Sequence, residues 1–178
     1  MNSYMMTDAE LLLLGLVAEM PRHGYELEQV IEQRGMREWT QIGFSSIYFV
    51  LGKLEKAGFL ASERPAGGKA KKAFSITPAG EEALVAQATK ALSCFRSTYS
   101  SVLLGMVHWP VLSRETALAA LKTRDDTVSR EMERLERIRF ERQPLPDFIE
   151  ALFDFSAGQL EAEKTWIAKT LDYMETKP

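Results

Sequence analysis

The stretch "GFSSIYFVLGKLEKAGFL", residues 43–60, combines apolar and polar side chains in a pattern that decides the fold. Ile47, Leu51 and Leu54 are spaced by four and three residues, so they form one apolar stripe on an α-helix. Gly58 is placed to end that helix. Polar side chains lie off the stripe, and they are Ser45, Ser46, Tyr48, Lys53 and Lys56. The segment therefore predicts a helix that is anchored by one side and presents polar groups on the others.

Two more helices are predicted before this one. The sequence "TDAE" (7–10) has the pattern of a capping box, which opens a helix by satisfying its first amides with side chains. Pro21 ends this helix because proline cannot continue the hydrogen-bond ladder. In residues 22–35, Gly24 predicts a turn, and a second helix follows that stops at Gly35.

A β-hairpin is predicted after the third helix. Residues 59–65 and 72–77 alternate apolar and polar side chains, as strands do. Between them, "AGGKAK" (66–71) supplies glycines for the turn and lysines for its tip. Three helices followed by a small hairpin is the order of a winged helix. We therefore predict a winged helix-turn-helix DNA-binding domain over residues 1–84.

The C-terminal half predicts long helices. One helix runs from Pro78 to about Tyr99, and Ser113 and Asp147 begin two others. The helix that begins at Ser113 has an apolar seam, interrupted at Asp125, that consists of Leu118, Leu121, Val128, Met132 and Leu135.

Seams of this kind need a partner surface, and a second copy of the chain is the commonest one. Residues 85–178 are therefore predicted to be an α-helical dimerisation domain. The expected fold class is mainly α with a small β-hairpin wing.

Composition and charge exclude some classes of protein and indicate where a nucleic acid could bind. Apolar residues make up 46% of the chain and charged residues 26%, which excludes a disordered protein. The net charge is −3, but residues 43–80 hold six basic and two acidic side chains, so this segment is a local basic patch of +4. The apolar run at 11–20 is too short to span a membrane and has no basic leader, so we expect a cytoplasmic protein with no membrane partner.

Polar residues of the predicted third helix and wing are candidate contacts to double-stranded DNA. A helix that enters the major groove needs polar side chains at its exposed N-terminal end. We expect Ser45 and Ser46 to touch bases or phosphates and the Tyr48 hydroxyl to touch phosphate. Alternatively, the serines only cap the helix and Tyr48 packs on the second helix. The basic side chains expected near phosphates are Lys53, Arg64, Lys69, Lys71 and Lys72.

Three motifs in this order are similar to those of a known family. They are "LLLLGLVAEMPRHGYELEQVIEQ" (11–33), "SSIYFVLGKLEKAGFL" (45–60) and "KKAFSITPAGEEAL" (71–84). Over about residues 8–84 the chain resembles the PadR-like transcriptional regulators. The resemblance implies a DNA-binding winged helix and a contact between Tyr25 and the DNA backbone. Alternatively, Tyr25 packs in the core. The chain departs from the family pattern at Gly43 and Phe44, where a small pair such as Ser-Pro is frequent.

The resemblance also implies a homodimer formed through the C-terminal helices and a response to phenolic or other planar compounds. We therefore expect a repressor that binds a palindromic operator and is released by a small molecule or another signal. Aromatic side chains can wall a pocket for a planar effector, although as individuals they also suit an interface core. The candidate pocket residues are Phe95, Tyr99, Trp109 and Trp166.

Nothing in the sequence predicts an enzyme or a metal site. His23 and His108 have no acidic or cysteine partner at ligand spacing, and Cys94 is the single cysteine. Neither a phosphate-binding glycine loop nor a nucleophile elbow is present. We expect no catalytic activity, no metal and no cofactor. The alternative that stays open is a winged-helix module that binds protein through the same surface and has no DNA-binding activity.

Overall fold

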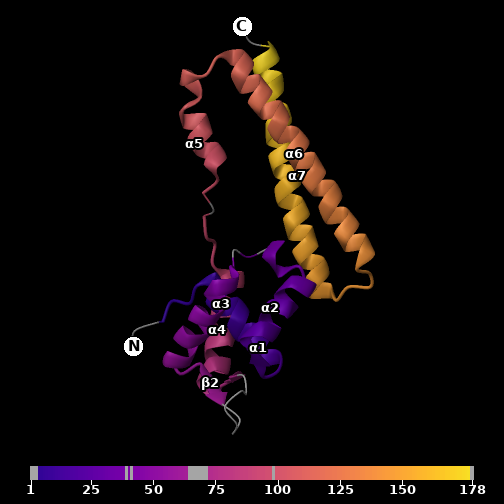
Figure 1. Ribbon diagram of the computed structural model, residues 1–178. Helices are drawn as coiled ribbons and strands as arrows, with labels where there is room; N and C mark the ends of the chain where they lie inside the picture. The colour runs from indigo at the N-terminus through magenta and orange to yellow at the C-terminus, as the bar shows by residue number, and fades with distance from the viewer. Residues whose placement is uncertain (1–3, 39, 41, 64–71, 98, 177–178) are drawn as a thin grey trace. The chain divides into compact units, whose positions relative to one another are not determined.

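The computed structural model describes residues 4–38, 40, 42–63, 72–97 and 99–176. The chain forms two compact units, residues 1–97 and residues 98–178 (Figure 1). The predicted fold class is confirmed, because the chain is mainly helical and the first unit holds a small antiparallel sheet. Within the described residues, no helix is long and apolar enough to cross a membrane.

The first unit begins with the predicted capping box. The Thr7 hydroxyl accepts a hydrogen bond from the Glu10 amide at 3.3 Å, and Glu10 Oε2 accepts one from the Thr7 amide at 2.7 Å. Helix α1 (Asp8–Glu19) follows from this cap and ends before Pro21, as predicted. Helix α2 (Gly24–Gln33) and a 3-10 turn, η1 (Met36–Glu38), come next.

The opening stretch forms helix α3 (Phe44–Lys56), and the predicted end of this helix is confirmed. The Phe59 amide donates to the Leu54 carbonyl at 3.0 Å, and the Gly58 amide donates to the Glu55 carbonyl at 3.0 Å. These two bonds are a Schellman motif, which needs a left-handed residue after the helix. Gly58 supplies it with a φ of 80°, a conformation that costs glycine little.

A three-stranded sheet completes the wing, whereas two strands were predicted. Strand β2 (Leu60–Glu63) and strand β3 (Ala73–Ile76) form the predicted hairpin. Strand β1 (Arg22–His23) pairs with β3 on its other side, so the order is β1-β3-β2 and all pairs are antiparallel. The prediction of only a turn at this place was wrong, because two residues are too few for an alternating pattern and their partner lies far along the sequence. The predicted tip, residues 66–71, lies outside the described residues.

The core of the first unit is formed by α1, α2, α3 and the sheet. The predicted stripe of α3 is confirmed, since Ile47, Leu51 and Leu54 have no exposed surface. This stripe fixes which side of α3 faces away from the core. The remaining side chains of the buried cluster are Met6, Leu13, Leu14, Leu16, Val17, Leu27, Ile31, Ile42, Val50, Leu60 and Phe74.

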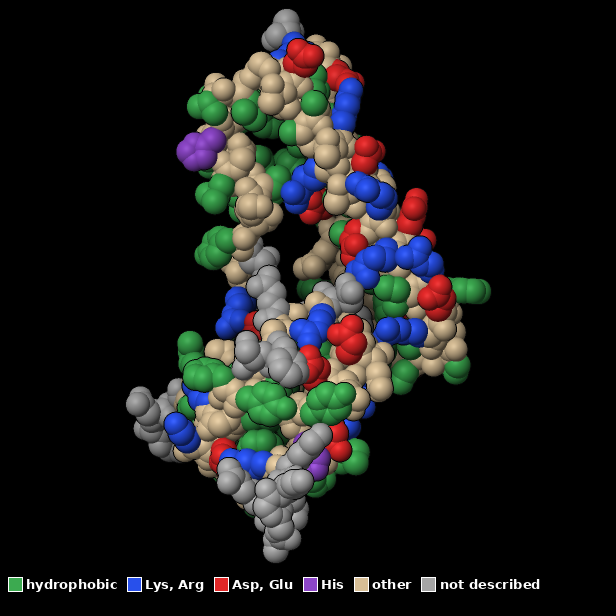
Figure 2. Space-filling view, in the orientation of Figure 1, with side chains coloured by type: hydrophobic (Ala, Val, Ile, Leu, Met, Phe, Trp, Pro, Cys, Tyr) green, Lys and Arg blue, Asp and Glu red, His purple; other side chains and the backbone are tan. Residues whose placement is uncertain are grey.

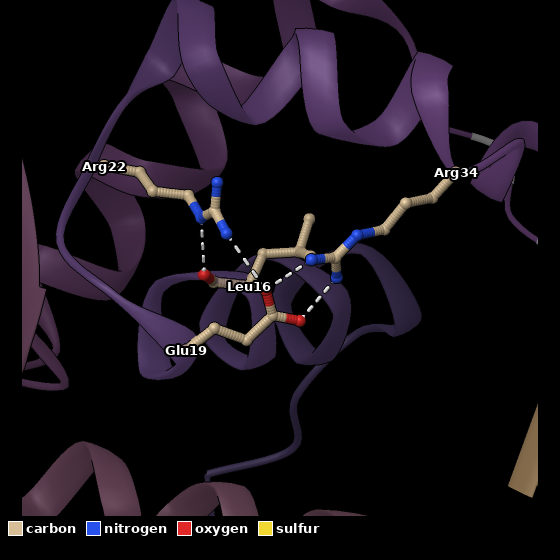
Figure 3. A network of polar contacts seen from close by, with 4 residues as sticks. All are labelled: Leu16, Glu19, Arg22 and Arg34. Atoms are coloured by element: carbon tan, nitrogen blue, oxygen red, sulfur yellow. Dashed lines mark hydrogen bonds and ion pairs between the residues drawn. The ribbon is translucent and has the colours of Figure 1, made fainter. Parts of the chain in front are cut away.

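Glu19, at the end of α1, binds two arginines (Figure 3). Arg34, the C-cap of α2, donates to Glu19 Oε2 at 2.8 Å. Arg22 of β1 donates to the same oxygen at 3.0 Å and to the Leu16 carbonyl at 3.1 Å. The hydrogen bonds from Arg34 outweigh the opposing effect of burial and lower the pKa of Glu19. The network ties the end of α1 to the end of α2.

Helix α4 (Pro78–Ser93) is shorter than predicted. The expectation that it continues to Tyr99 was wrong, because the helix ends at Cys94. Serine and threonine side chains crowd residues 93–101, and such side chains compete with a helix for backbone hydrogen bonds. The predicted domain boundary between residues 84 and 85 falls inside α4, whose packing places all of it in the first unit. As a functional division this boundary stays a prediction.

The second unit consists of α5 (Ser101–Val107), the 3-10 turn η2 (Trp109–Val111) and the long helices α6 (Arg114–Glu141) and α7 (Asp147–Thr176). Helices α6 and α7 lie side by side along most of their length (Figure 1). The interruption of the predicted seam at Asp125 has a structural role. Lys164 of α7 donates to Asp125 at 3.0 Å and to the Ser129 hydroxyl at 2.6 Å, so a polar bridge joins the two helices there.

Candidate nucleic-acid interface and ligand cavity

The side of α3 opposite to the buried stripe is the surface that this helix can offer to a partner. Its N-cap is Gly43, which has no side chain to cap the first turn. Phe49 is 74% exposed, and Lys56 is exposed two turns further along. Both lie about 180 to 200° around the helix from Ile47, at 100° per residue. Neither was predicted as a contact, although the helical period that gave the stripe also places them opposite to it.

Tyr48 packs against α2 and is also partly exposed to solvent. A Cβ atom at Gly24 would lie 2.6 Å from Tyr48 Cε1, so the tyrosine ring sits directly on the first residue of α2. The packing that was the alternative interpretation of Tyr48 is therefore present. The side chain is nevertheless 52% exposed, and Tyr25 beside Gly24 is 49% exposed. Packing on α2 and contact with a partner are compatible for Tyr48.

Lys53 is held by a buried carboxylate. Its Nζ lies 2.8 Å from Oε1 of Glu10, a residue that is only 1% exposed. The Tyr4 hydroxyl donates to the same oxygen at 2.6 Å. A charge this deeply buried is stable only when it is paired and hydrogen-bonded. Lys53 is therefore first of all a link between α3 and the start of α1, and its predicted contact with DNA stays a prediction.

The pKa of Glu10 reflects this arrangement. Burial by itself raises the pKa, but the hydrogen bonds from Lys53, the Thr7 amide, the Tyr4 hydroxyl and the Thr7 hydroxyl outweigh it. Together they lower the pKa to about 2. Glu10 is thus a permanent anion at neutral pH, and it keeps Lys53 oriented on α3.

Lys72, at the base of the wing, is also paired within the domain. Its Nζ lies 2.6 Å from Glu55 Oε2 and 4.9 Å from the centre of the Phe74 ring. The other oxygen of Glu55 accepts a hydrogen bond from the Ser62 hydroxyl. This cluster joins the end of α3 to both strands of the hairpin.

The structure describes only some of the remaining residues that were predicted to contact DNA. Ser46 lies in the first turn of α3 and is half-buried. The side chain of Ser45 and the wing residues Arg64, Lys69 and Lys71 lie outside what the structure describes. Their roles stay predictions.

A cavity of about 230 Å³ lies in the second unit, between α5, η2, α6 and α7. Two predicted effector residues, Trp109 and Trp166, line it. The structure does not bring the other two to this lining: Phe95 belongs to the first unit, and both Phe95 and Tyr99 are almost fully exposed. The rest of the lining was not predicted and consists of Val102, Gly105, Met106, Leu112, Ala117, Ala120, Leu121 and Arg124.

Residues 13–86 match the family described as the transcriptional regulator PadR-like family. These residues span the helix-turn-helix, the wing and the first half of α4. The N-terminal part of the chain, residues 13–86, is therefore similar to the PadR-like transcriptional regulators. The resemblance deduced from the sequence is therefore confirmed.

Solved PadR-like structures have the same fold. Bacillus subtilis PadR in complex with operator DNA gives a TM-score of 0.75 at 18% identity, over 93% of this chain and 98% of that chain. The same protein in complex with p-coumaric acid gives 0.74 at 18% identity over the same shares. A PadR-like regulator from Bacillus cereus gives 0.66 at 21% identity, over 96% of this chain and 100% of that chain. No curated protein sequence matches this chain.

The PadR-like motifs have physical reasons in this structure. The glycine of His-Gly-Tyr-Glu-Leu is Gly24, which leaves room for the Tyr48 ring. The threonine that precedes α4 is Thr77, whose hydroxyl accepts from the Gly80 amide at 3.0 Å and donates to the Gly58 carbonyl at 2.7 Å. These residues of the PadR-like motifs therefore lie where α2, α3 and α4 approach one another.

Proposed function

We propose that this chain is a homodimeric, sequence-specific DNA-binding repressor that places α3 in the major groove. The observation that carries the proposal is the outward face of α3, where Tyr48, Phe49 and Lys56 are exposed on a helix whose other side is fully buried. The match of residues 13–86 to the PadR-like regulators supports it, and the similar Bacillus subtilis PadR was solved with operator DNA. The function is not enzymatic and would be carried out in the cytoplasm.

The contacts to DNA divide into two kinds. The first turn of α3 has only Gly43 as its N-cap, so its amides can meet a phosphate, and Ser46 lies beside them. Tyr25 of α2 and Tyr48 of α3 are about half exposed, and we propose that both contact the DNA backbone. Lys56 and the wing cations Arg64, Lys69 and Lys71 supply positive charge along the groove. These contacts position the domain, and base contacts from α3 would supply the specificity.

The second unit has the surface that a homodimer needs. Several apolar side chains are exposed along α5 and η2 (Figure 2), and exposed apolar surface of this kind is typical of interaction sites. We propose that a second copy of the chain covers them. The exposed residues are Leu103, Leu104, Met106, Val107, Val111 and Leu112.

The cavity of the second unit is the proposed effector site. Its two tryptophans suit a flat apolar ring, and a cavity of about 150 Å³ is known to hold benzene, so about 230 Å³ suits a single-ring compound. Arg124 lines the cavity and donates to Glu163, so the wall also carries a polar group. The Bacillus subtilis relative was solved with p-coumaric acid, which makes that compound the first probe.

Selection of bound duplexes from a random pool tests the proposal. We expect the full chain to enrich a palindrome whose half-sites are about one helical turn apart or a multiple of it. The same duplex tests the effector, because p-coumaric acid is expected to weaken binding by the wild type but not by Trp166→Ala. A pool without enrichment would contradict DNA recognition, while an unchanged affinity in p-coumaric acid would contradict this class of effector. The comparisons give no support to the alternative, a module that binds only protein.

A further inference from the structure

Contacts among the described residues do not explain two residues on the outward face of α3. Phe49 is a large apolar side chain left 74% exposed in the middle of the helix. Gly52, three residues later on the same face, is a glycine at which an added Cβ would meet no atom of the described residues within 4 Å. Lys56 continues the face one turn further.

Gly52 destabilises the helix that contains it. Glycine inside a helix is less favourable than alanine, because it loses more backbone freedom on folding. Its φ is not positive, so the backbone does not require glycine there. No neighbouring atom requires it either, in contrast to Gly24 and Gly80. The missing side chain leaves room for a partner to come close to the α3 backbone at Gly52.

The surroundings of Phe49 favour nucleic acid as the approaching partner. Lys56 lies on the same face, and residues 43–80 carry an excess of positive charge. An apolar protein surface would have to desolvate Lys56, whereas the DNA backbone pairs with it. In the major groove the apolar feature is the C5-methyl group of thymine, which phenylalanine can contact.

We propose that Phe49 and Gly52 read thymine: the Phe49 ring packs against a thymine methyl group, and Gly52 lets the base edges come close to the α3 backbone. This inference rests on the proposed function and adds the base that the helix prefers. Phe49 and Gly52 are specificity-determining residues, in contrast to Glu10, which is buried and holds Lys53 and the start of α1 in place.

Deoxyuridine tests this proposal because it differs from thymidine only by the methyl group. The duplex enriched by the full chain is synthesised with each thymine replaced in turn, and affinities are measured by fluorescence anisotropy at one salt concentration. Loss of one buried methyl should weaken binding about fourfold, and symmetric replacement in both half-sites roughly 15-fold. Equal affinity for thymidine and deoxyuridine at every position would overturn the proposal while leaving DNA binding intact.

Variants assign the effect to the two residues. Phe49→Ala should bind the thymidine and deoxyuridine duplexes equally, whereas Val85→Ala, an exposed apolar truncation on α4, should keep the wild-type discrimination. Gly52→Ala should raise the melting temperature and yet weaken operator binding, which a purely structural role would not produce. Retained discrimination in Phe49→Ala would overturn the proposal. Absence of binding to any duplex would instead contradict the proposed function itself.

Discussion

Replacing Gly80 with alanine is expected to destabilise the winged-helix unit by about 3 kcal/mol, because the added methyl group has no space. Its Cβ would lie 2.2 Å from the Phe59 carbonyl oxygen and 2.8 Å from Ile76 Cγ1. The first of these is a backbone atom, and it accepts a hydrogen bond from the Thr77 amide at 3.0 Å. It cannot move without disturbing the junction between α3, the wing and α4. Urea denaturation of the wild type and the variant measures the loss.

Gly52→Ala is the matched control for this substitution. It adds the same methyl group where nothing lies within 4 Å, so it should stabilise the unit by roughly 1 kcal/mol through helix propensity. Opposite signs for the two glycines are therefore expected. A Gly80→Ala protein as stable as the wild type would show that α4 does not approach Phe59 as closely as described.

Glu10→Gln is expected to remove roughly 3 kcal/mol of stability at neutral pH, the magnitude that follows from a pKa lowered from 4.5 to about 2. Glutamine has one acceptor oxygen and an amide group that would face the Lys53 ammonium, so the buried site loses its charge and part of its hydrogen bonding. Glu82→Gln on the exposed side of α4 is the control and should change stability little.

The pH dependence of stability tests whether Glu10 is ionised in the folded protein. A carboxyl group whose pKa is lowered by folding stabilises the protein fully above its unfolded pKa, and this contribution disappears as the pH falls toward the folded value. The stability difference between the wild type and Glu10→Gln should therefore be constant above about pH 5 and shrink between pH 4.5 and pH 2. A difference that does not depend on pH would contradict an ionised, buried Glu10.

Local sequence patterns predicted the elements whose determinants are local. The stripe of Ile47, Leu51 and Leu54, the capping box before α1 and the glycine after α3 each depend on residues within a few positions, and all three are confirmed. The features that sequence reasoning missed depend on distant partners. Strand β1 exists only because β3 is beside it, and the Glu10–Lys53 pair joins α1 to α3.

In the candidate site, too, some residues were predicted from the sequence and others were missed. Polar residue types directed the prediction to Ser46, Tyr48 and Lys53, but the exposed face of α3 is centred on Phe49 and Lys56. Helical geometry alone would have identified both, since they lie opposite to the buried stripe. Among the aromatic residues, only the fold separates Trp109 and Trp166, which line the cavity, from Phe95 and Tyr99. The aromatic content of the sequence does not predict which rings line the same cavity.

The salt dependence of operator binding tests the central claim most directly. If Lys56, Arg64, Lys69 and Lys71 each neutralise a phosphate, a dimer makes about eight contacts, and the slope of log K against log salt concentration should be near −7. Lys56→Gln removes two contacts per dimer and should reduce the slope to about −5, whereas Lys90→Gln on α4 should leave it unchanged. A slope near zero, or one that Lys56→Gln leaves at the wild-type value, would contradict the placement of α3 against DNA.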